Sequence, residues 1–471
     1  MIVVDKRSAT PVHRQVYDAW RRAILAGLVR RGERLPSTRE LANTLAVSRS
    51  TVSHAYEQLT AEGYLQAAQG AGTFVCAELP DDLVPASAAS PATAATPAIR
   101  LSRFGVRLED DFAYPPQPSD HICFSRWGPD IDQFPFALWR RLLMRTMRNP
   151  RHEHFDYARR AQGFACLREE IAAYVARSRA VRCTPEQVIV VNGSQQALDL
   201  AARLLLEPGD EVTFENPGYA GTRRVFEAYG LRLRPARIDA EGIVPGDLGK
   251  RSRLVYVTPS HQFPTGVAMS LARRLELIAW ARERNAVIIE DDYDSEYRYS
   301  GAPLPSLQGL TTDVPVVYCG TFSKVMFPAL RIGWVVVPRS LVAPFTRAKW
   351  LADRHSPMLE QVALADFLGE GHLDRHVRRM RRLYGHRRQV LVDALEQTFG
   401  SRASVRGDAA GMHLLVRLDD PGVLARAVRN KVQLVRAETY YLAGGPPNEY
   451  VFGFSTLHDR TIRQGVKRLI D

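Results

Sequence analysis

The chain has 471 residues, of which 45% are hydrophobic and 24% charged, and its formal net charge is +12. That length exceeds one ordinary domain, and the composition suits a globular protein with a sizeable core. The absence of an 18-residue apolar run and the charged start MIVVDKRSATP argue against a membrane helix and a signal peptide. Five scattered cysteines favour free thiols over disulfides or a zinc site, so we expect a cytoplasmic protein without a metal.

The sequence divides into a small head, a tether and a large body. Residues 77–98 are rich in Ala, Pro, Ser and Thr and contain no aromatic residue, which is typical of an exposed linker. Residues 99–120 are either the end of the tether or an irregular start of the body. We therefore predict a head over residues 1–76, a linker over 77–113 and a body over 114–471.

The head begins with a helix after Thr10-Pro11, which supplies a cap followed by a proline at the first helical position. Hydrophobic residues four apart predict its buried face: Val12, Val16, Trp20, Ile24 and Leu28. A capping box from Ser37 to Glu40 opens a short second helix, and Ser48 can cap a third. The buried face of the third helix is predicted to be Val52, Ala55, Tyr56 and Leu59.

Two short strands, 64–67 and 73–75, follow these helices and complete a winged helix-turn-helix pattern. Such a fold places the first residues of its recognition helix against base edges in the major groove of DNA. In this sequence those residues are Ser48, Arg49, Ser50, Thr51 and His54. Arg39 is positioned to hold a phosphate, and Gly70 lies in the turn of the wing. For this segment taken alone, a capped helix with a solvated face is the alternative.

The body contains a lysine directly after an apolar strand. Lys324 follows the predicted strand Val314–Tyr318, and a buried lysine with a lowered pKa can form a Schiff base with an aldehyde. Arg331, seven residues later, could return to the same place as a cation for phosphate. A surface lysine is the alternative for this pattern alone.

Three further segments carry polar residues at the ends of predicted strands. Asp291 and Tyr293 follow the strand at 286–290, where α/β sheets bind ligands, although a solvated acidic turn is the alternative. Gly193, Ser194 and Gln195 follow the strand at 188–191 and open a helix whose N–H groups can hold a phosphate. Tyr219 follows the strand at 212–214 and could cover a ring face.

Together these segments resemble the fold-type-I aminotransferases over roughly residues 120–471. The resemblance implies an α/β fold with a large domain on a mixed, mostly parallel sheet and a smaller α+β domain from about residue 346. It implies pyridoxal 5'-phosphate as the cofactor, with Lys324 as the Schiff-base lysine, Asp291 at the pyridine nitrogen and Tyr293 at the ring hydroxyl. The residues implied at the phosphate are Gly193, Ser194, Gln195, Ser323 and Arg331. Tyr219 is implied to stack on the ring.

The head resembles the GntR family over LPSTRELANTLAVSRSTVSHAYEQLTAEGYL and GAGTFV. Its fusion to an aminotransferase-like body, with TPSHQFPTG at 258–266 and RRMRRLYGHRR at 378–388, resembles the MocR regulators, which include GabR-like and PdxR-like members. This implies a transcription regulator that forms a head-to-tail homodimer away from membranes. Its implied partners are double-stranded operator DNA, pyridoxal phosphate and an amine effector. For the arginine-rich run, we favour one solvated face of a long helix over a second DNA site.

The sequence departs from working aminotransferases at two positions. Phe263 replaces the asparagine that precedes Pro-Thr-Gly, and His261 or Gln262 could substitute for it. Val451 occupies the position of the arginine that clamps a substrate carboxylate, unless the alignment slips toward Arg436 or Arg460. A softer departure concerns Tyr157, which lies six residues before Gly163, where the family usually has five.

These departures favour a sensor over an enzyme. The leading interpretation is a regulator that senses pyridoxal phosphate or an amine through a Schiff base at Lys324 and controls genes of vitamin B6 or amino-compound metabolism. Pyridoxal phosphate itself is slightly favoured as the effector over an amine with another acidic group, such as taurine. The alternative is a catalytically competent aminotransferase that carries a DNA-binding domain.

Overall fold

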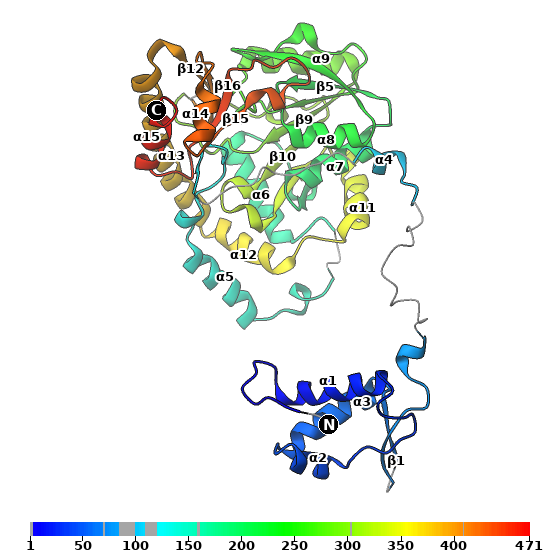
Figure 1. Ribbon diagram of the computed structural model, residues 1–471. Helices are drawn as coiled ribbons and strands as arrows, with labels where there is room; N and C mark the ends of the chain where they lie inside the picture. Colours follow the sequence, from blue (N-terminus) through cyan, green and yellow to red (C-terminus); the bar gives the residue numbers. More distant parts are fainter. Residues whose placement is uncertain are drawn as a thin grey trace. The chain divides into compact units, whose positions relative to one another are not determined.

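The computed structural model describes residues 3–68, 71–83, 99–108, 120–157, 161–301, 304–407 and 409–471. Contacts divide the chain into two compact units, Met1–Arg100 and Leu101–Asp471 (Figure 1). Within the described residues, no helix is both long and apolar enough to cross a membrane.

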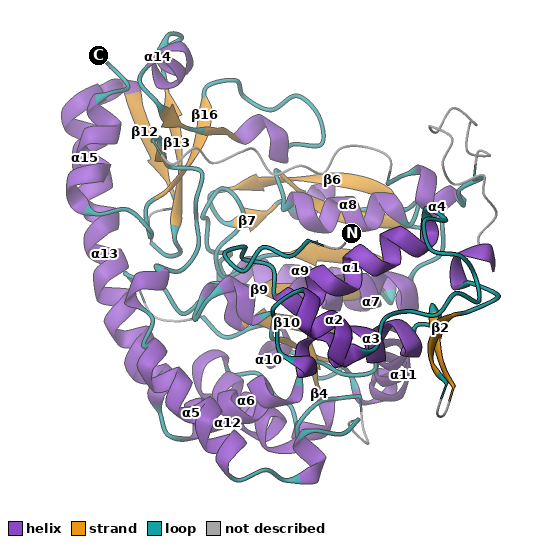
Figure 2. Cartoon of the chain, turned by 60° about the horizontal axis from the view of Figure 1, so that its bottom comes forward, coloured by secondary structure: helices purple, strands orange, loops and turns teal. Residues whose placement is uncertain are grey.

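The first unit has three helices and a hairpin, which Figure 2 shows by element type. Its elements are α1 (Val12–Leu25), α2 (Thr38–Thr44), α3 (Arg49–Ala61), β1 (Leu65–Ala68) and β2 (Gly72–Val75). The strands pair antiparallel, with Leu65 opposite Val75. This is the winged helix-turn-helix that the sequence predicts.

The caps and core of the head follow the predicted pattern with two corrections. Ser37 and Ser48 each accept a backbone N–H three residues on, and the four residues predicted on the buried face of α3 are buried. Leu28, however, is 80% exposed, because α1 ends at Leu25. Pro11 rather than Thr10 is the N-cap residue of α1, and it makes no side-chain cap bond.

The second unit is built on an eight-stranded sheet in the order β4-β11-β10-β9-β8-β5-β6-β7. Its strands are β4 (Val188–Val191), β5 (Glu211–Asn216), β6 (Arg232–Asp239), β7 (Gly242–Ile243), β8 (Leu254–Val257), β9 (Val287–Asp292), β10 (Val316–Thr321) and β11 (Gly333–Val336). The neighbours from β10 to β6 run parallel, whereas β11 is antiparallel to β10 and β4, and β7 is antiparallel to β6. The mixed, mostly parallel sheet is confirmed.

Apolar side chains on alternate positions bury both faces of this sheet. Val188 and Val190 face one core, while Ile189 and Val191 face the other. The helices in contact with the first core are α5 (Phe136–Arg148), α6 (Ala165–Arg179), α12 (Met358–Gly369) and the start of α13 (His372–Phe399). Those in contact with the second are α7 (Ser194–Leu205), α8 (Ala220–Ala228) and α11 (Val342–Asp353). Such burial on both faces is typical of a sheet that helices cover on each side.

A smaller antiparallel sheet, ordered β12-β13-β16-β15, forms the carboxyl-terminal domain. Its elements are β12 (Ala403–Arg406), β13 (His413–Leu418), β15 (Val435–Arg436), β16 (Glu449–Gly453), α13 (His372–Phe399), α14 (Val423–Arg429) and α15 (Asp459–Lys467). This domain was expected from about residue 346. Helices α11 and α12 bury their apolar residues against the large sheet, and α13 adds Leu373 and Val377 to the same core before it packs on the small sheet, so the boundary near residue 346 stays a prediction. The amino-terminal strand β3 (Ile122–Cys123) also joins it by pairing with β14 (Val432–Gln433).

The described ends of the predicted linker pack on the two units. Asp81 accepts a hydrogen bond of 2.5 Å from Tyr64 in the head. Helix α4 (Arg103–Val106) places Phe104 5.0 Å from the Tyr229 ring in the body, measured between ring centroids. The rest of the expected linker lies outside the described residues.

The arginine-rich run lies on α13, where most of its arginine side chains are exposed, as predicted. Arg388 is half-buried, and Arg387 is buried and pairs with Asp130 at 2.8 Å. One member of this run therefore ties α13 to the start of the body.

Candidate functional site

Lys324 lies directly after β10, in the short 3-10 helix Phe322–Lys324. Its Nζ donates a hydrogen bond of 2.9 Å to the backbone oxygen of Trp127. Burial lowers the pKa of the Lys324 amine, although the carboxylates of Asp294 and Asp291 partly oppose that shift. A lowered pKa raises the share of neutral, nucleophilic amine.

Asp291 lies beside this lysine at the end of β9, where its backbone is in register with Cys319 of β10. Tyr256 donates a hydrogen bond of 2.8 Å to Asp291 Oδ2. Asp291 Oδ1 is buried and has no hydrogen-bond partner among the residues that the structure describes. Burial raises the pKa of Asp291 to about 7. The alternative of a solvated acidic turn is therefore wrong for this residue.

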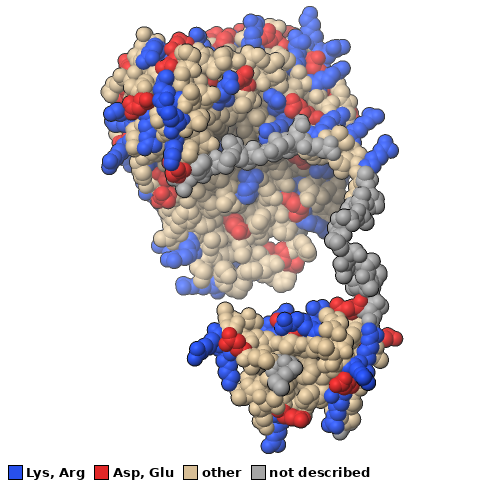
Figure 3. All heavy atoms as spheres, in the orientation of Figure 1, with Lys and Arg blue, Asp and Glu red and all other residues tan. Residues whose placement is uncertain are grey.

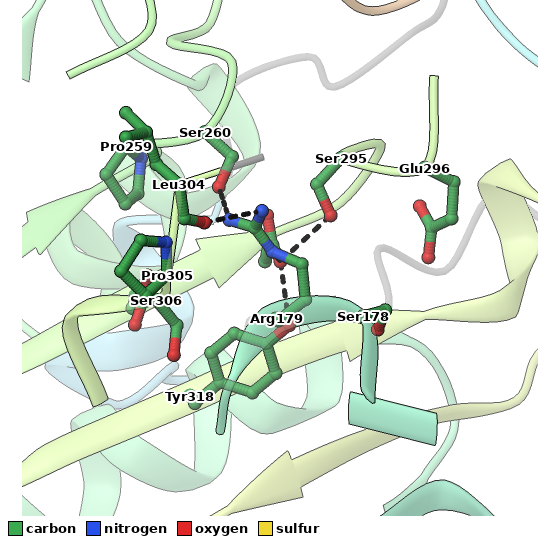
Figure 4. A network of polar contacts seen from close by, with 12 residues as sticks. Ser178, Arg179, Pro259, Ser260, Ser295, Glu296, Leu304, Pro305, Ser306 and Tyr318 are labelled. Atoms are coloured by element: carbon green, nitrogen blue, oxygen red, sulfur yellow. Dashed lines mark hydrogen bonds and ion pairs between the residues drawn. The ribbon is translucent and has the colours of Figure 1, made fainter. Parts of the chain in front are cut away.

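A buried ion pair holds the end of β9 in place (Figure 4). Arg179 at the end of α6 donates 2.7 Å to Asp292 Oδ2, and it also bonds Ser260 and the backbone oxygen of Leu304. Tyr318 and Ser295 donate to the same carboxylate oxygen of Asp292. Although burial disfavours its charge, the Arg179 cation and these donors keep the pKa of Asp292 below its usual value. Successive side chains alternate along a strand, so anchoring Asp292 fixes Asp291 on the opposite side.

Tyr293 follows on the same segment and contacts His261. Its hydroxyl lies 2.9 Å from the backbone oxygen of His261 and 3.0 Å from His261 Nδ1. The same ring nitrogen lies 3.0 Å from Asp294 Oδ2. His261, Asp294 and His413 are all buried, with ligand-type atoms within 4.8 Å of one another. Tyr293 is therefore held by a buried polar cluster.

Arg331 contacts the segment between β4 and α7. Arg331 donates 2.7 Å to the backbone oxygen of Asn192, and a Cβ atom on Gly193 would lie 2.8 Å from its guanidinium. Gly193 has a φ of 83°, which favours glycine. Ser194 begins α7 and is half-buried, whereas Gln195 is exposed and donates to Gly221 O at 3.1 Å. The structure thus places Gly193, Ser194 and Arg331 at one helix N-terminus, and Gln195 at its edge.

These residues fit pyridoxal phosphate. The unpartnered Asp291 Oδ1 can accept the proton of a pyridine nitrogen, and the helix N-terminus with Arg331 can hold a dianionic phosphate. Ser323 Oγ is also buried without a hydrogen-bond partner in the described part of the chain. Tyr219 lies with its ring against Gly221, 5.7 Å from the Phe263 ring between centroids.

The recognition helix of the head begins with exposed polar residues. Arg49, Ser50 and His54 are exposed, and Thr51 is half-buried. Ser48 is a cap as well as a surface residue, since its hydroxyl accepts from Thr51 N and lies 2.8 Å from Ser50 Oγ. Arg39 is exposed in the first turn of α2. Gly70 lies outside the described residues.

The head and the body of the chain match two different families. A profile of aminotransferase class I and II matches residues 148–468, and one of bacterial regulatory proteins of the gntR family matches residues 12–75. A "Probable rhizopine catabolism regulatory protein MocR" from Rhizobium meliloti is 40% identical, over 100% of this chain and 95% of that protein. The chain belongs to the MocR-type GntR regulators.

Other similar proteins support both halves of this MocR-type regulator. The "HTH-type pyridoxine biosynthesis transcriptional regulator PdxR" of Corynebacterium glutamicum is 31% identical over 100% of this chain and 98% of that protein. The structure of LysN, an alpha-aminoadipate aminotransferase from Thermus thermophilus, has a TM-score of 0.69 and 30% identity, covering 74% of this chain and 91% of that one. The cofactor of the body is pyridoxal 5'-phosphate, and the head binds DNA.

The two departures from working aminotransferases have structural counterparts in this MocR-type regulator. Gln262, which could substitute for the missing asparagine, has its amide group in hydrogen bonds to Glu215, Pro217 O, Phe263 O and Thr265. Val451 is fully buried in β16 opposite Leu415 and Val435. Arg436 pairs with Tyr450 in the sheet, so it belongs to the opposite face from Val451, and Arg460 is exposed on α15. This arrangement supports Val451 as the aligned position.

Several residues at the site escaped the sequence analysis. Trp127, Tyr256, Asp294, His413 and Tyr440 come from five separate segments. Trp127 contacts Lys324 across 197 residues of chain, and Tyr256 contacts Asp291 across 35. Asp294 lies in the segment for which a solvated acidic turn was the alternative interpretation. The other four lie in no local motif, so no sequence signal could have identified them.

Proposed function

We propose that this protein regulates transcription, and that its binding to operator DNA depends on what occupies the site at Lys324. The occupant is pyridoxal phosphate, alone or joined to an amine. One contrast carries the proposal: Asp291, Lys324 and the phosphate cradle are complete, whereas Phe263 and Val451 stand where aminotransferases hold cofactor and substrate. The cofactor is kept while a substrate anchor is lost.

Each residue has a distinct part in this proposal. When bound, pyridoxal phosphate supplies an electrophilic aldehyde carbon. Lys324 offers its neutral amine, and Asp291 Oδ1 holds the proton of the pyridine nitrogen. Gly193, Ser194, Gln195, Ser323 and Arg331 hold the phosphate, Tyr293 contacts the ring hydroxyl and Tyr219 covers the ring.

In the head, we assign Arg49, Ser50, Thr51 and His54 to base edges and Arg39 to a phosphate, with Ser48 acting mainly as a cap. We assign Gly70 to the wing. Recognition helices of this type read the major groove with their amino-terminal residues. The exposure of these side chains supports the assignment.

We further propose a head-to-tail homodimer in which two heads bind two half-sites. Exposed large apolar side chains on the body support a protein interface: Phe136, Met144, Met147, Phe155, Trp350 and Leu351. The similarity to PdxR, named for pyridoxine biosynthesis, supports vitamin B6 genes as targets. The relative named for rhizopine catabolism supports catabolic genes as targets instead.

The test is a gel-shift series on DNA upstream of this gene, with and without pyridoxal phosphate. We expect the cofactor to change operator affinity or DNA bending in the native chain, and Lys324→Ala to weaken that response. Lys250→Ala removes an exposed lysine and is the matched control. Identical affinity and bending with and without cofactor would refute the proposal.

A second candidate is a working aminotransferase that carries a DNA-binding head. The 30% identity to LysN over 74% of this chain favours it. Incubating the cofactor-loaded protein with amino acids and measuring keto-acid product separates the two. Product at ordinary aminotransferase rates, with DNA binding insensitive to the cofactor, would establish the second candidate.

A further inference from the structure

Four aromatic residues surround the approach to Lys324, and we call Trp127, Phe263, His413 and Tyr440 the ring cluster. The backbone oxygen of Trp127 accepts the hydrogen bond from Lys324 Nζ. Centroid distances from the Trp127 ring are 5.9 Å to Phe263, 6.1 Å to His413 and 6.5 Å to Tyr440. Phe263 and His413 are buried, whereas Trp127 and Tyr440 are partly exposed, so the cluster keeps an accessible side.

Phe263 links this cluster to the residues assigned to the cofactor. Its ring centroid lies 4.9 Å from Tyr440 and 5.1 Å from His413. On the other side it lies 5.7 Å from Tyr219 and 6.4 Å from Tyr293. A group attached to the cofactor near Lys324 would therefore meet aromatic surface.

The small domain extends this surface with aliphatic side chains. His413 and Leu415 lie two residues apart and therefore share one face of β13. Val451 of β16 lies directly opposite Leu415 on that face. Trp127 and Tyr440 pack against Leu415 and Val451. The other face of the same strands, with Leu414 and Phe452, packs into the core of the small domain. Arg417, next along the first face, is exposed and pairs with Asp419 at 3.0 Å.

The charges around the cluster disfavour an anionic ligand. Burial lowers the pKa of His413 well below its usual value, so this ring is neutral. Asp294, 1% exposed, contributes a buried carboxyl group to the same region. Apart from Lys324, the described residues of the ring cluster and those packed with Trp127 and Tyr440 include no cation, so a ligand carboxylate placed against them would lose its water without an ion pair, which is costly.

We propose that the effector joined to the cofactor at Lys324 is a primary amine with an uncharged, ring-shaped or alkyl body and no carboxylate, seated against the ring cluster. This rests on the proposed function and defines its ligand class. With pyridoxal phosphate bound, the exchange would replace the double bond between Lys324 Nζ and the aldehyde carbon by a double bond to the ligand nitrogen. Two protons would pass from the ligand amine to Lys324 Nζ, which leaves as a neutral amine, so no oxidant is needed.

A matched pair of probes tests this with the full-length, cofactor-loaded protein. Benzylamine and 4-(aminomethyl)benzoate differ by one carboxylate. We expect benzylamine to saturate the change in cofactor absorbance at a concentration lower by about tenfold or more, the effect of one unpaired buried polar group. Equal or tighter binding of 4-(aminomethyl)benzoate would overturn the proposal, and this comparison needs no variant.

Two variants test whether the face that carries Val451 causes the preference for benzylamine. Cofactor affinity and circular dichroism check that both variants fold. Val451→Arg places a cation on the face of β16 that packs against the ring cluster, so it should improve binding of 4-(aminomethyl)benzoate about tenfold or more. Arg436→Ala removes a cation from the opposite face and should leave the preference unchanged. An unchanged preference in folded Val451→Arg protein, or a changed one in Arg436→Ala, would overturn the assignment of this face to the ligand.

The absorbance and gel-shift measurements separate this inference from the proposed function. A preference for benzylamine with DNA binding insensitive to cofactor and amine would refute the regulatory function and support the pocket chemistry. A response of DNA binding to pyridoxal phosphate, together with no preference for benzylamine, would refute the pocket chemistry alone.

Discussion

Tyr256 donates its hydroxyl hydrogen to Asp291 Oδ2 across 2.8 Å, and this bond leaves Asp291 Oδ1 as a buried acceptor without a partner in the described structure. A buried, half-satisfied carboxylate is unfavourable unless a ligand completes it. Burial raises the pKa of Asp291 although the Tyr256 bond opposes that shift, and the free Oδ1 marks the place of a protonated ring nitrogen.

Replacing Asp291 should weaken the binding of the cofactor more than replacing Tyr256 does. Asp291→Asn loses a charged hydrogen bond worth about 1.5–3 kcal/mol, which is about 10- to 100-fold in cofactor affinity. Tyr256→Phe removes a neutral donor and should cost only several-fold. Fluorescence titration of the cofactor-free protein measures both, and an Asp291→Asn affinity equal to that of the native protein would contradict the assignment.

The stability of the cofactor-free protein should fall as the pH rises. Asp291 has a pKa of about 7 in the folded chain and about 3.9 when unfolded. Its contribution to stability is therefore fully present below about pH 4 and lost as the pH rises through 7. Thermal unfolding between pH 5 and 8 should show this decline, and Asp291→Asn should flatten it. Burial also raises the pKa values of Glu215, Glu290 and Glu296 to about 7, so some decline of stability with pH should remain in Asp291→Asn.

Changing Arg331 or Gly193, which are assigned to the phosphate, should weaken the binding of the cofactor without unfolding the protein. Arg331→Ala removes a cation beside the α7 N-terminus, and we expect about a 10- to 100-fold loss of affinity. Gly193→Ala should act similarly, since its Cβ would lie 2.8 Å from the Arg331 guanidinium and its φ is 83°. Arg339→Ala, at an exposed site, is the control. Native affinity in Arg331→Ala would remove this arginine from the site.

The buried pair Arg179–Asp292 should matter for folding. Arg179→Ala leaves a buried carboxylate without its cation, which costs about 3–5 kcal/mol of unfolding free energy. Arg282→Ala breaks a 2.6 Å pair with Asp313 on the surface and should have little effect. Urea unfolding of the two variants compares them directly, and equal midpoints would show that Arg179 does not anchor β9.

The head should lose DNA affinity in a way that depends on salt. Arg49→Ala should weaken operator binding, because Arg49 is assigned to a base edge, and Arg39→Ala, which removes the assigned phosphate contact, should reduce the salt slope of log affinity by about 1. Ser48→Ala should instead destabilise the head by about 1 kcal/mol, because it removes a helix cap. Arg22→Ala, exposed on α1, is the control. Native affinity and slope in Arg49→Ala would exclude this residue from the interface.

Local patterns in the sequence determined the elements of both units. The spacing of Val52, Ala55, Tyr56 and Leu59 identified the recognition helix, and the strand at 188–191 was predicted at its observed bounds. Strands before Asp291 and Lys324 were predicted too, although their ends lie one to three residues from those expected. These predictions succeed because caps, turns and buried periodicity depend on neighbouring residues.

Only the tertiary structure decided what surrounds Lys324. Trp127, His413 and Tyr440 reach it from distant segments, and the register between β13, β15 and β16 decides that Val451 faces the site while Arg436 does not. Contacts of this kind follow from how sheets pack, and no local period encodes them. The sequence by itself determined the cofactor and predicted Lys324 as its lysine, whereas the packing of the small domain decided which side chains lie around that lysine.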